Sequence, residues 1–118
     1  VQRSGQRVLW VCDSMYGNTI PTATGLKTRS FDAIRGELEK TIDVHDAAKT
    51  RLGGVHFELT GEDVTECIGG ASGVTEAGLS TNYGSACDPR LNYQQSLELA
   101  FLLSRRMSKP VNGTGWGN

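Results

Sequence analysis

The sequence predicts an α/β fold built from a strand, a helix and a second strand, in that order. Two short apolar runs, at residues 7–12 and 55–59, have the length and composition of strands. Between them, apolar residues recur at helical spacing. A strand, a helix and a strand in this order form a parallel pair joined by a right-handed crossover.

The first predicted strand, Arg7-Val8-Leu9-Trp10-Val11-Cys12, is almost continuously apolar. This is typical of a strand covered on both faces in a parallel sheet. A polar loop follows, beginning with Asp13 and containing Gly17-Asn18-Thr19. A Thr-rich connection with Pro21 and Gly25 then leads to the helix.

Residues 30–44 predict an amphipathic helix. Its apolar positions, spaced by three and four, are Phe31, Ile34, Leu38 and Ile42. Gly36 inside it costs up to about 1 kcal/mol relative to alanine. Gly53-Gly54 is expected to break the chain before the second strand, Val55-His56-Phe57-Glu58-Leu59, which is rich in β-forming residues.

The last third of the chain predicts a long loop and a final helix. Residues 60–89 are rich in Gly, Ser, Thr and acidic residues, and loops of this length in compact domains are usually functional. Residues 96–107 form a strongly apolar segment that predicts a helix ending at Arg105-Arg106. We expect one domain over residues 1–109 and a disordered tail over 110–118, which holds three glycines.

Composition excludes several classes of function. Twelve basic and thirteen acidic residues give a net charge of −1, so no nucleic-acid surface is expected. No apolar run approaches the roughly 20 residues of a membrane span, and the first residues contain no signal core. Three widely spaced cysteines favour a reducing cytoplasm over a disulfide framework. Because the sequence does not begin with methionine, we expect it to be a piece of a longer protein.

Polar groups gather in three motifs that each follow an apolar run, at residues 12–19, 55–61 and 86–92. Glu58 lies in an apolar strand, where a carboxylate needs a partner or a cation, or else reaches water at the strand end. His56 would share its face by strand alternation, although such a histidine is more often a packing residue. Asp88 before Pro89 fits a turn as well as a ligand.

Other polar candidates have an ordinary structural interpretation beside the functional one. Lys27-Thr28-Arg29 form a small basic cluster suited to phosphate, but a solvated helix entry also explains them. Cys67 and Cys87 are interpreted as small apolar groups, because no base accompanies them.

Together, the motifs resemble the C-terminal part of a class II (plant-type) 3-deoxy-D-arabino-heptulosonate 7-phosphate (DAHP) synthase. The resemblance runs from about Arg7 to Met107 in collinear order. The stretches that carry it are Trp10 to Thr19, Thr24 to Asp32, Asp43 to His45, Gly53 to Gly61, Asp63 to Gly70 and Ala86 to Asn92, followed by Gln95-Ser96-Leu97.

This resemblance implies a TIM-type (β/α)₈ barrel of which the chain carries the last two βα units. A closed barrel needs about 200 residues or more, so 118 residues hold only part of one. The implied strands are Val8 to Cys12 and Val55 to Leu59, with Ser96 to Met107 as the closing helix. The implied partners are the missing N-terminal barrel portion or further copies of the chain, because the part alone would expose sheet edges.

The resemblance also implies a divalent metal, manganese or a similar ion, with Glu58 and Asp88 as ligands by motif position. The family motif Cys-Asp-x-Met-His-Gly-Asn-Thr supplies a histidine ligand where this sequence has Tyr16. A phenol must lose a proton of pKa near 10 before it binds a metal well, so metal binding is weakened or lost if Tyr16 cannot ligate. A nearby dication can lower that pKa.

The implied reaction is the metal-dependent condensation of phosphoenolpyruvate with erythrose 4-phosphate, the first step of the shikimate pathway to aromatic amino acids. Lys27 and Arg29 match motif positions near the site and are assigned electrostatic roles. The alternative is a degenerate, non-catalytic relative acting as a partner or structural module. A weaker third alternative, a hydrolase, requires Glu58, Asp88 and His56 to surround one metal.

Overall fold

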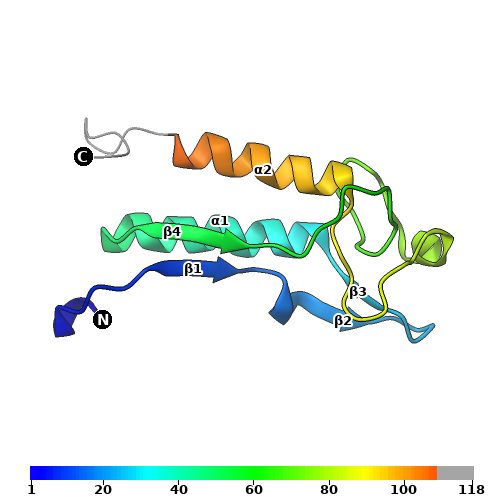
Figure 1. The fold of residues 1–118 in the computed structure, drawn as a ribbon, viewed down its shortest axis with the longest axis horizontal. Helices are drawn as coiled ribbons and strands as arrows, with labels where there is room; N and C mark the ends of the chain where they lie inside the picture. Colours follow the sequence, from blue (N-terminus) through cyan, green and yellow to red (C-terminus); the bar gives the residue numbers. More distant parts are fainter. Residues whose placement is uncertain (109–118) are drawn as a thin grey trace.

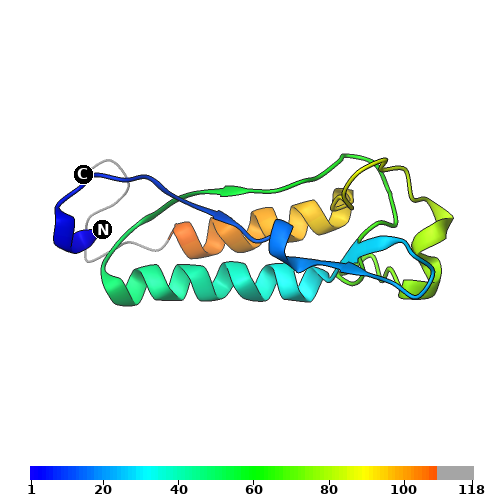
Figure 2. The ribbon, with the colours of Figure 1, turned by 90° about the horizontal axis from the view of Figure 1, so that it is seen from below.

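Two parallel strands with two helices on the same side form the main body of the chain (Figure 1, Figure 2). The computed structural model describes residues 1–108, and the predicted tail lies outside these described residues. In chain order the elements are η1 (Gln2–Ser4), β1 (Trp10–Asp13), η2 (Tyr16–Asn18), β2 (Thr19–Pro21), β3 (Lys27–Arg29), α1 (Phe31–Ala48), β4 (Leu52–His56), η3 (Glu76–Thr81) and α2 (Tyr93–Met107). The predicted mixed α/β class is confirmed.

The sheet pairs β1 with β4 in parallel, with Cys12 opposite Val55. Because α1 lies between these strands in the chain, the predicted parallel pairing through a helix is confirmed. The predicted strand bounds, 8–12 and 55–59, are only partly right. β1 begins two residues later than predicted, and β4 begins three residues earlier and ends three residues earlier.

The predicted chain break at Gly53-Gly54 is wrong, because both glycines lie inside β4. A Cβ atom on Gly53 would come within 2.2 Å of Leu9 Cδ1 and 3.3 Å of the Trp10 carbonyl oxygen. The register between the strands shifts at the same place, between Trp10 and Val11. Glycine inside a strand often marks such a close approach of a neighbouring chain segment.

Both predicted helices are present and slightly longer than predicted. Ser30 caps α1 by accepting a hydrogen bond from the Ala33 N–H at 3.3 Å, and α1 ends where Lys49 turns into the left-handed region at φ 55°. Asn92 and Gln95 cap α2 reciprocally: each side chain accepts the other's backbone N–H, at 2.9 and 3.0 Å. Local capping thus sets where both helices begin.

The core lies between the helices and the facing side of the sheet. The predicted apolar stripe of α1 is buried there in full. The buried apolar residues of this core are Cys12, Met15, Phe31, Ile34, Leu38, Ile42, Leu52, Cys67, Leu91, Leu99 and Leu102.

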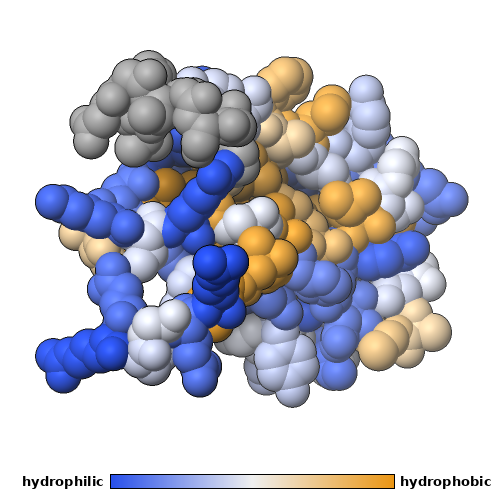
Figure 3. Space-filling view, turned by 60° about the vertical axis from the view of Figure 1, so that its left-hand side comes forward, coloured by the Kyte–Doolittle hydropathy of each residue, from blue (hydrophilic) through white to orange (hydrophobic). Residues whose placement is uncertain are grey.

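The other side of the sheet is open within residues 1–108. Cys12 is the one buried residue of β1, so the prediction of a strand covered on both faces is wrong for this part of the chain. The exposed apolar residues of β1 and its flanks, with Leu59 after β4, are Val8, Leu9, Trp10, Val11 and Leu59. Of these, Trp10 lies on the helix side, where its ring centroid is 5.5 Å from that of His45 on α1. Figure 3 shows one face on which apolar side chains gather between hydrophilic ones.

Sequence patterns missed a second, antiparallel sheet of β2 and β3. The Thr-rich connection forms this hairpin, whose turn is closed by hydrogen bonds between Thr22 and Leu26 and between Gly25 and Thr22. Gly25 adopts φ 86°, which favours glycine. The predicted long loop over 60–89 is confirmed, with η3 as its short helical turn. None of the helices within residues 1–108 is both long and apolar enough to cross a membrane.

Candidate active site

Two of the polar motifs follow the carboxyl ends of the paired strands β1 and β4, and the third joins them there. Tyr16 begins η2 just after β1, and Glu58 lies two residues beyond β4. Leu91 pairs in parallel with the segment after β4: its N–H donates to the Glu58 carbonyl oxygen at 2.9 Å, and its carbonyl accepts from the Thr60 N–H at 3.0 Å. This pairing brings the motif that contains Asp88 to the same end of the sheet.

The interpretation of Glu58 as a residue within a strand is wrong. β4 ends at His56, so strand alternation does not place these two side chains on one face. The His56 side chain is exposed. The side chain of Glu58 is 29% exposed, which lets it contact both buried groups and solvent.

Arg29, the last residue of β3, is the centre of the polar network at this end. Its side chain is fully buried. Nη1 donates to the Glu58 carboxylate and to the Pro89 carbonyl oxygen, the latter at 2.8 Å. Nε donates to Thr19 Oγ1 at 2.9 Å. Arg29 therefore links the hairpin to the second and third motifs.

The remaining guanidinium nitrogen of Arg29, Nη2, is buried and has no hydrogen-bond partner within residues 1–108. An unsatisfied buried polar group costs about 1–3 kcal/mol, and more when it is charged. The guanidinium fork matches the paired oxygens of carboxylate and phosphate groups. Arg29 thus has donor capacity left for an anionic group.

Lys27 lies two residues before Arg29 on β3 and contacts the other candidate carboxylate. Its Nζ is 3.3 Å from Asp88 Oδ1, and the two side chains are 57% and 29% exposed. The interpretation of residues 27–29 as a solvated helix entry is therefore wrong for Arg29 and fits only Lys27. Each cation of β3 is paired with one predicted metal ligand.

Glu58 and Asp88 supply hard oxygen donors of the kind that Mn²⁺ and Mg²⁺ prefer. Within residues 1–108, no three His, Cys, Asp or Glu side chains come together as a metal site. The donor set therefore fits part of a metal site, and further ligands would have to come from another residue type or from outside this range. The hydrolase alternative, which needs His56 beside both carboxylates, gains no support from this arrangement.

The side chain of Tyr16 is 75% exposed at the end of β1. Its backbone N–H and that of Met15 donate to Asp13 Oδ1, at 3.2 and 2.9 Å. Burial acts to raise the pKa of Asp13, but these N–H groups and the nearby positive charges hold it below its usual value. Asp13 thereby fixes the backbone of η2, while the phenol of Tyr16 faces solvent.

Cys67 and Cys87 near this network differ in their burial. Cys67 is fully buried, and burial raises the pKa of its thiol to about 12. The interpretation of Cys67 as a small apolar group is confirmed by its place in the core. Cys87 is exposed, so the same interpretation is wrong for it.

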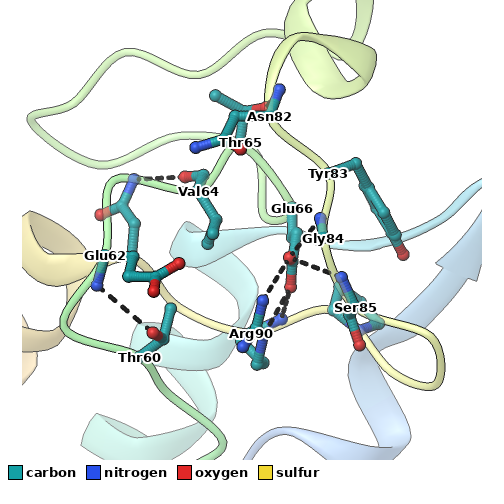
Figure 4. Close-up of polar contacts among 12 residues, drawn as sticks. Thr60, Glu62, Val64, Thr65, Glu66, Asn82, Tyr83, Gly84, Ser85 and Arg90 are labelled. Atoms are coloured by element: carbon teal, nitrogen blue, oxygen red, sulfur yellow. Dashed lines mark hydrogen bonds and ion pairs between the residues drawn. The ribbon is translucent and has the colours of Figure 1, made fainter.

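Glu66 is a functional candidate to which the sequence patterns gave no role. It is fully buried, and the backbone N–H groups of Gly84, Ser85 and Arg90 each donate to its carboxylate at 2.9 Å. The Arg90 guanidinium adds bonds of 3.1 and 2.9 Å (Figure 4). Burial acts to raise the pKa of Glu66, but these donors hold it below its usual value. Its position between Val64 and Cys67, in a partly apolar stretch, is a signal that could have identified it.

The chain was compared with known proteins. The model of the class-II DAHP synthetase family matches residues 1–104. Phospho-2-dehydro-3-deoxyheptonate aldolase AroG of Mycolicibacterium smegmatis is 52% identical over 107 residues, which cover 91% of this chain and 23% of the relative. The phospho-2-dehydro-3-deoxyheptonate aldolase of Neurospora crassa is 56% identical over 97 residues, covering 82% of this chain and 20% of the relative.

The chain therefore spans less than a quarter of the length of these relatives. The family match nevertheless includes both strands of the parallel sheet, the hairpin and most of α2. It also includes all five predicted site residues, whose positions are 16, 27, 29, 58 and 88. By sequence, and with the α/β architecture that its residues adopt, this chain belongs to the class-II DAHP synthetase family.

Proposed function

We propose that the chain forms the last two βα units of a (β/α)₈ barrel. The parallel pair β1 and β4, joined through α1 and followed by α2, has the order that such units require. The open apolar side of the sheet would become part of the barrel interior. We propose the preceding barrel portion as the partner that covers it, with association between copies of the chain as the other possibility.

We propose that the assembled barrel is a DAHP synthase, a transferase that condenses phosphoenolpyruvate with erythrose 4-phosphate in the shikimate pathway. Both relatives are named phospho-2-dehydro-3-deoxyheptonate aldolases. The observation that carries this proposal is the pairing of Glu58 with Arg29 and of Asp88 with Lys27 at one end of the sheet. Three cysteines present as thiols suit a reducing compartment, and we propose the cytoplasm.

In this proposal Glu58 and Asp88 are ligands of a divalent cation, Mn²⁺ or a similar ion. When bound, such an ion polarises a carbonyl group as a Lewis acid. Arg29 holds the Glu58 carboxylate in a fixed orientation, which a ligating carboxylate requires. Because Arg29 is also bonded to the Pro89 carbonyl oxygen, it fixes the chain next to Asp88 at the same time.

Lys27 and Arg29 are proposed to bind the negatively charged substrates. Both substrates carry a phosphate group, and Arg29 Nη2 is a buried donor with no partner within residues 1–108. Lys27 is exposed, so its ammonium group can turn from Asp88 toward a phosphate at little cost. The two cations would therefore bind the negatively charged phosphate groups of the substrates at this end of the sheet.

Tyr16 is the third proposed ligand and the position at which the site departs from the family motif. Its phenol reaches solvent at the end of β1, so it is free to turn toward an ion. A phenol binds a divalent cation well only after giving up its proton, whereas a neutral imidazole nitrogen binds one directly. We therefore expect metal binding to be weaker here than with a histidine.

The tyrosine at position 16, where the family motif has histidine, favours a second candidate function: a non-catalytic relative that serves as a partner or structural module. In that case the Glu58–Arg29 and Asp88–Lys27 pairs are purely structural. The absence of a histidine at position 16 would then mean that the chain no longer binds a catalytic metal. Both candidates predict the same fold for residues 1–108, so only an activity measurement separates them.

The experiment joins this chain to the preceding part of the M. smegmatis relative, giving a hybrid barrel. DAHP formation is assayed with Mn²⁺ for the chain alone, for the hybrid, and for the hybrid carrying Tyr16→His. Activity of the unmodified hybrid supports the synthase. An inactive hybrid that Tyr16→His restores supports the non-catalytic relative, and inactivity of both refutes the catalytic proposal for this chain.

A further inference from the structure

The carboxylate of Glu66 anchors the segment that leads to Asp88. Its Oε2 accepts the N–H groups of Gly84 and Ser85, and its Oε1 accepts the N–H of Arg90. The bonds therefore hold both ends of the 84–90 loop, and Figure 4 shows them converging on this one side chain. Asp88 lies between the two anchored ends.

Inside the loop, two further hydrogen bonds connect Ser85 to the backbone at Cys87 and Asp88. Ser85 Oγ donates to the Asp88 carbonyl oxygen at 2.6 Å and accepts from the Cys87 N–H at 3.2 Å. Since Glu66 holds the Ser85 backbone, the backbone of Asp88 is fixed through one intermediate residue.

Glu66 is also attached to the strand that carries the paired cations. Its backbone carbonyl accepts from Thr28 Oγ1 at 2.8 Å, and Thr28 lies between Lys27 and Arg29 on β3. Next to the loop, the Tyr83 hydroxyl donates to the Lys27 carbonyl oxygen at 2.8 Å. Glu66 thus connects the loop of Asp88 to the strand of its partner cation.

We propose that Glu66 is a positioning residue for this site, holding the 84–90 loop against β3 so that the Asp88 carboxylate stays beside Lys27. It acts through Ser85 and Arg90, since the hydrogen bonds of its carboxylate within residues 1–108 go to Gly84, Ser85 and Arg90 and to neither Asp88 nor Lys27. The assignment of Asp88 as a metal ligand rests on the proposed function, whereas the anchoring of the loop does not.

A carboxylate is required for this role because every group that faces it is a donor. Three backbone N–H groups and two guanidinium N–H groups point at the two oxygens. An amide in place of Glu66 would turn an NH₂ group toward one set of these donors, in either orientation. The loop would lose bonds at one of its ends without any change in side-chain size.

The test uses the full 118-residue chain with Glu66→Gln, and Glu98→Gln as the matched control. Glu98 also accepts a backbone N–H, that of Ala71 at 2.7 Å, but it does not contact the 84–90 loop in the bonds described. Amide hydrogen exchange is measured without metal or substrate. We expect the Ser85 and Arg90 amides to exchange about tenfold faster or more in Glu66→Gln and to be unchanged in Glu98→Gln, while α1 amides are unchanged in both.

Two results would overturn the positioning role. One is unchanged protection of the Ser85 and Arg90 amides in Glu66→Gln, and the other is an equal acceleration of the α1 amides, which would show a general loss of stability. If Glu66→Gln does not fold, Arg90→Lys replaces it, because this variant keeps the backbone N–H and the charge but loses the guanidinium fork. Faster exchange at Ser85 supports the role, and unchanged exchange there refutes it.

A second measurement separates this inference from the proposed function. Mn²⁺ binding to the hybrid barrel is followed by electron paramagnetic resonance with the same variants. An apparent Kd about tenfold higher in Glu66→Gln, with Glu98→Gln unchanged, supports both. If the unmodified hybrid binds no Mn²⁺ while loop exchange still depends on Glu66, the positioning role stands and the metal site fails. If Mn²⁺ binds with equal affinity in all variants although the loop exchanges faster, Asp88 does not need this positioning and the inference fails.

Discussion

Replacing Arg29 with methionine removes the buried cation of β3 while keeping a side chain of similar length. The change eliminates the bonds from Arg29 to Glu58, to the Pro89 carbonyl oxygen and to Thr19 Oγ1. It also removes the unpartnered Nη2, which offsets part of the loss. The net effect depends on how much of the Glu58 charge water can then solvate.

The expected loss is about 3 kcal/mol of unfolding free energy. Removing one partner of a buried ion pair costs about 3–5 kcal/mol, because the other charge is left uncompensated. The Glu58 side chain is 29% exposed, so water can reach its carboxylate and the lower end of this range applies. Lys27→Met is the matched control on the same strand. Its exposed pair with Asp88 is worth about 0–1 kcal/mol.

The measurement is urea unfolding of the chain followed by circular dichroism, for Arg29→Met, Lys27→Met and the double-mutant cycle of Arg29→Met with Glu58→Gln. The slope of free energy against urea should be the same in all variants, since the surface exposed on unfolding is unchanged. A loss below about 1 kcal/mol for Arg29→Met would refute the reasoning. Equal losses for the two strand positions would also refute it, because burial is the property that distinguishes them.

Three further predictions concern a helix cap, the acid range and the thiols. Asn92→Ala should lower stability by about 1–2 kcal/mol in thermal unfolding, because the side chain caps α2; no change would contradict the capping role. The pKa of Glu66 is held below its ordinary 4.5, so its contribution is present above that pH and is lost as pH falls through the lowered value. Below about pH 4.5, the unfolding free energy of Glu66→Gln should therefore fall less with decreasing pH than that of the unmodified chain, and an equal fall in both would contradict this prediction. With a thiol reagent at about pH 8, Cys87 should react rapidly and Cys67, whose pKa is about 12, only on unfolding; loss of the fast phase in Cys87→Ser checks the assignment.

The helices could be predicted because their determinants lie within a few residues of one another. The apolar stripe from Phe31 to Ile42 repeats every three or four residues and is buried as predicted. The Asn92 cap and its partner Gln95 are likewise only three residues apart, although the pattern placed the start of α2 three residues too late. The order of strand, helix and strand similarly implied a parallel pair.

The strand limits could not be predicted, because contacts with other segments set them. Gly53 fits within β4 because it has no Cβ atom, which would come within 2.2 Å of Leu9 Cδ1 and 3.3 Å of the Trp10 carbonyl oxygen, and no local pattern reveals that approach. The β2–β3 hairpin was hidden for a similar reason, as three-residue strands give too short a pattern to recognise.

By itself, the sequence determined the α/β class, the two helices, the family and the motifs that carry Glu58, Asp88 and Tyr16. The tertiary structure alone decided which charges meet. Lys27 pairs with Asp88 across 61 residues of chain, and Arg29 reaches Glu58 across 29. It also decided that Glu66 is buried and holds the 84–90 loop. Local periodicity reflects forces between near neighbours along the chain, whereas ion pairs and buried carboxylates depend on the path that brings distant segments together.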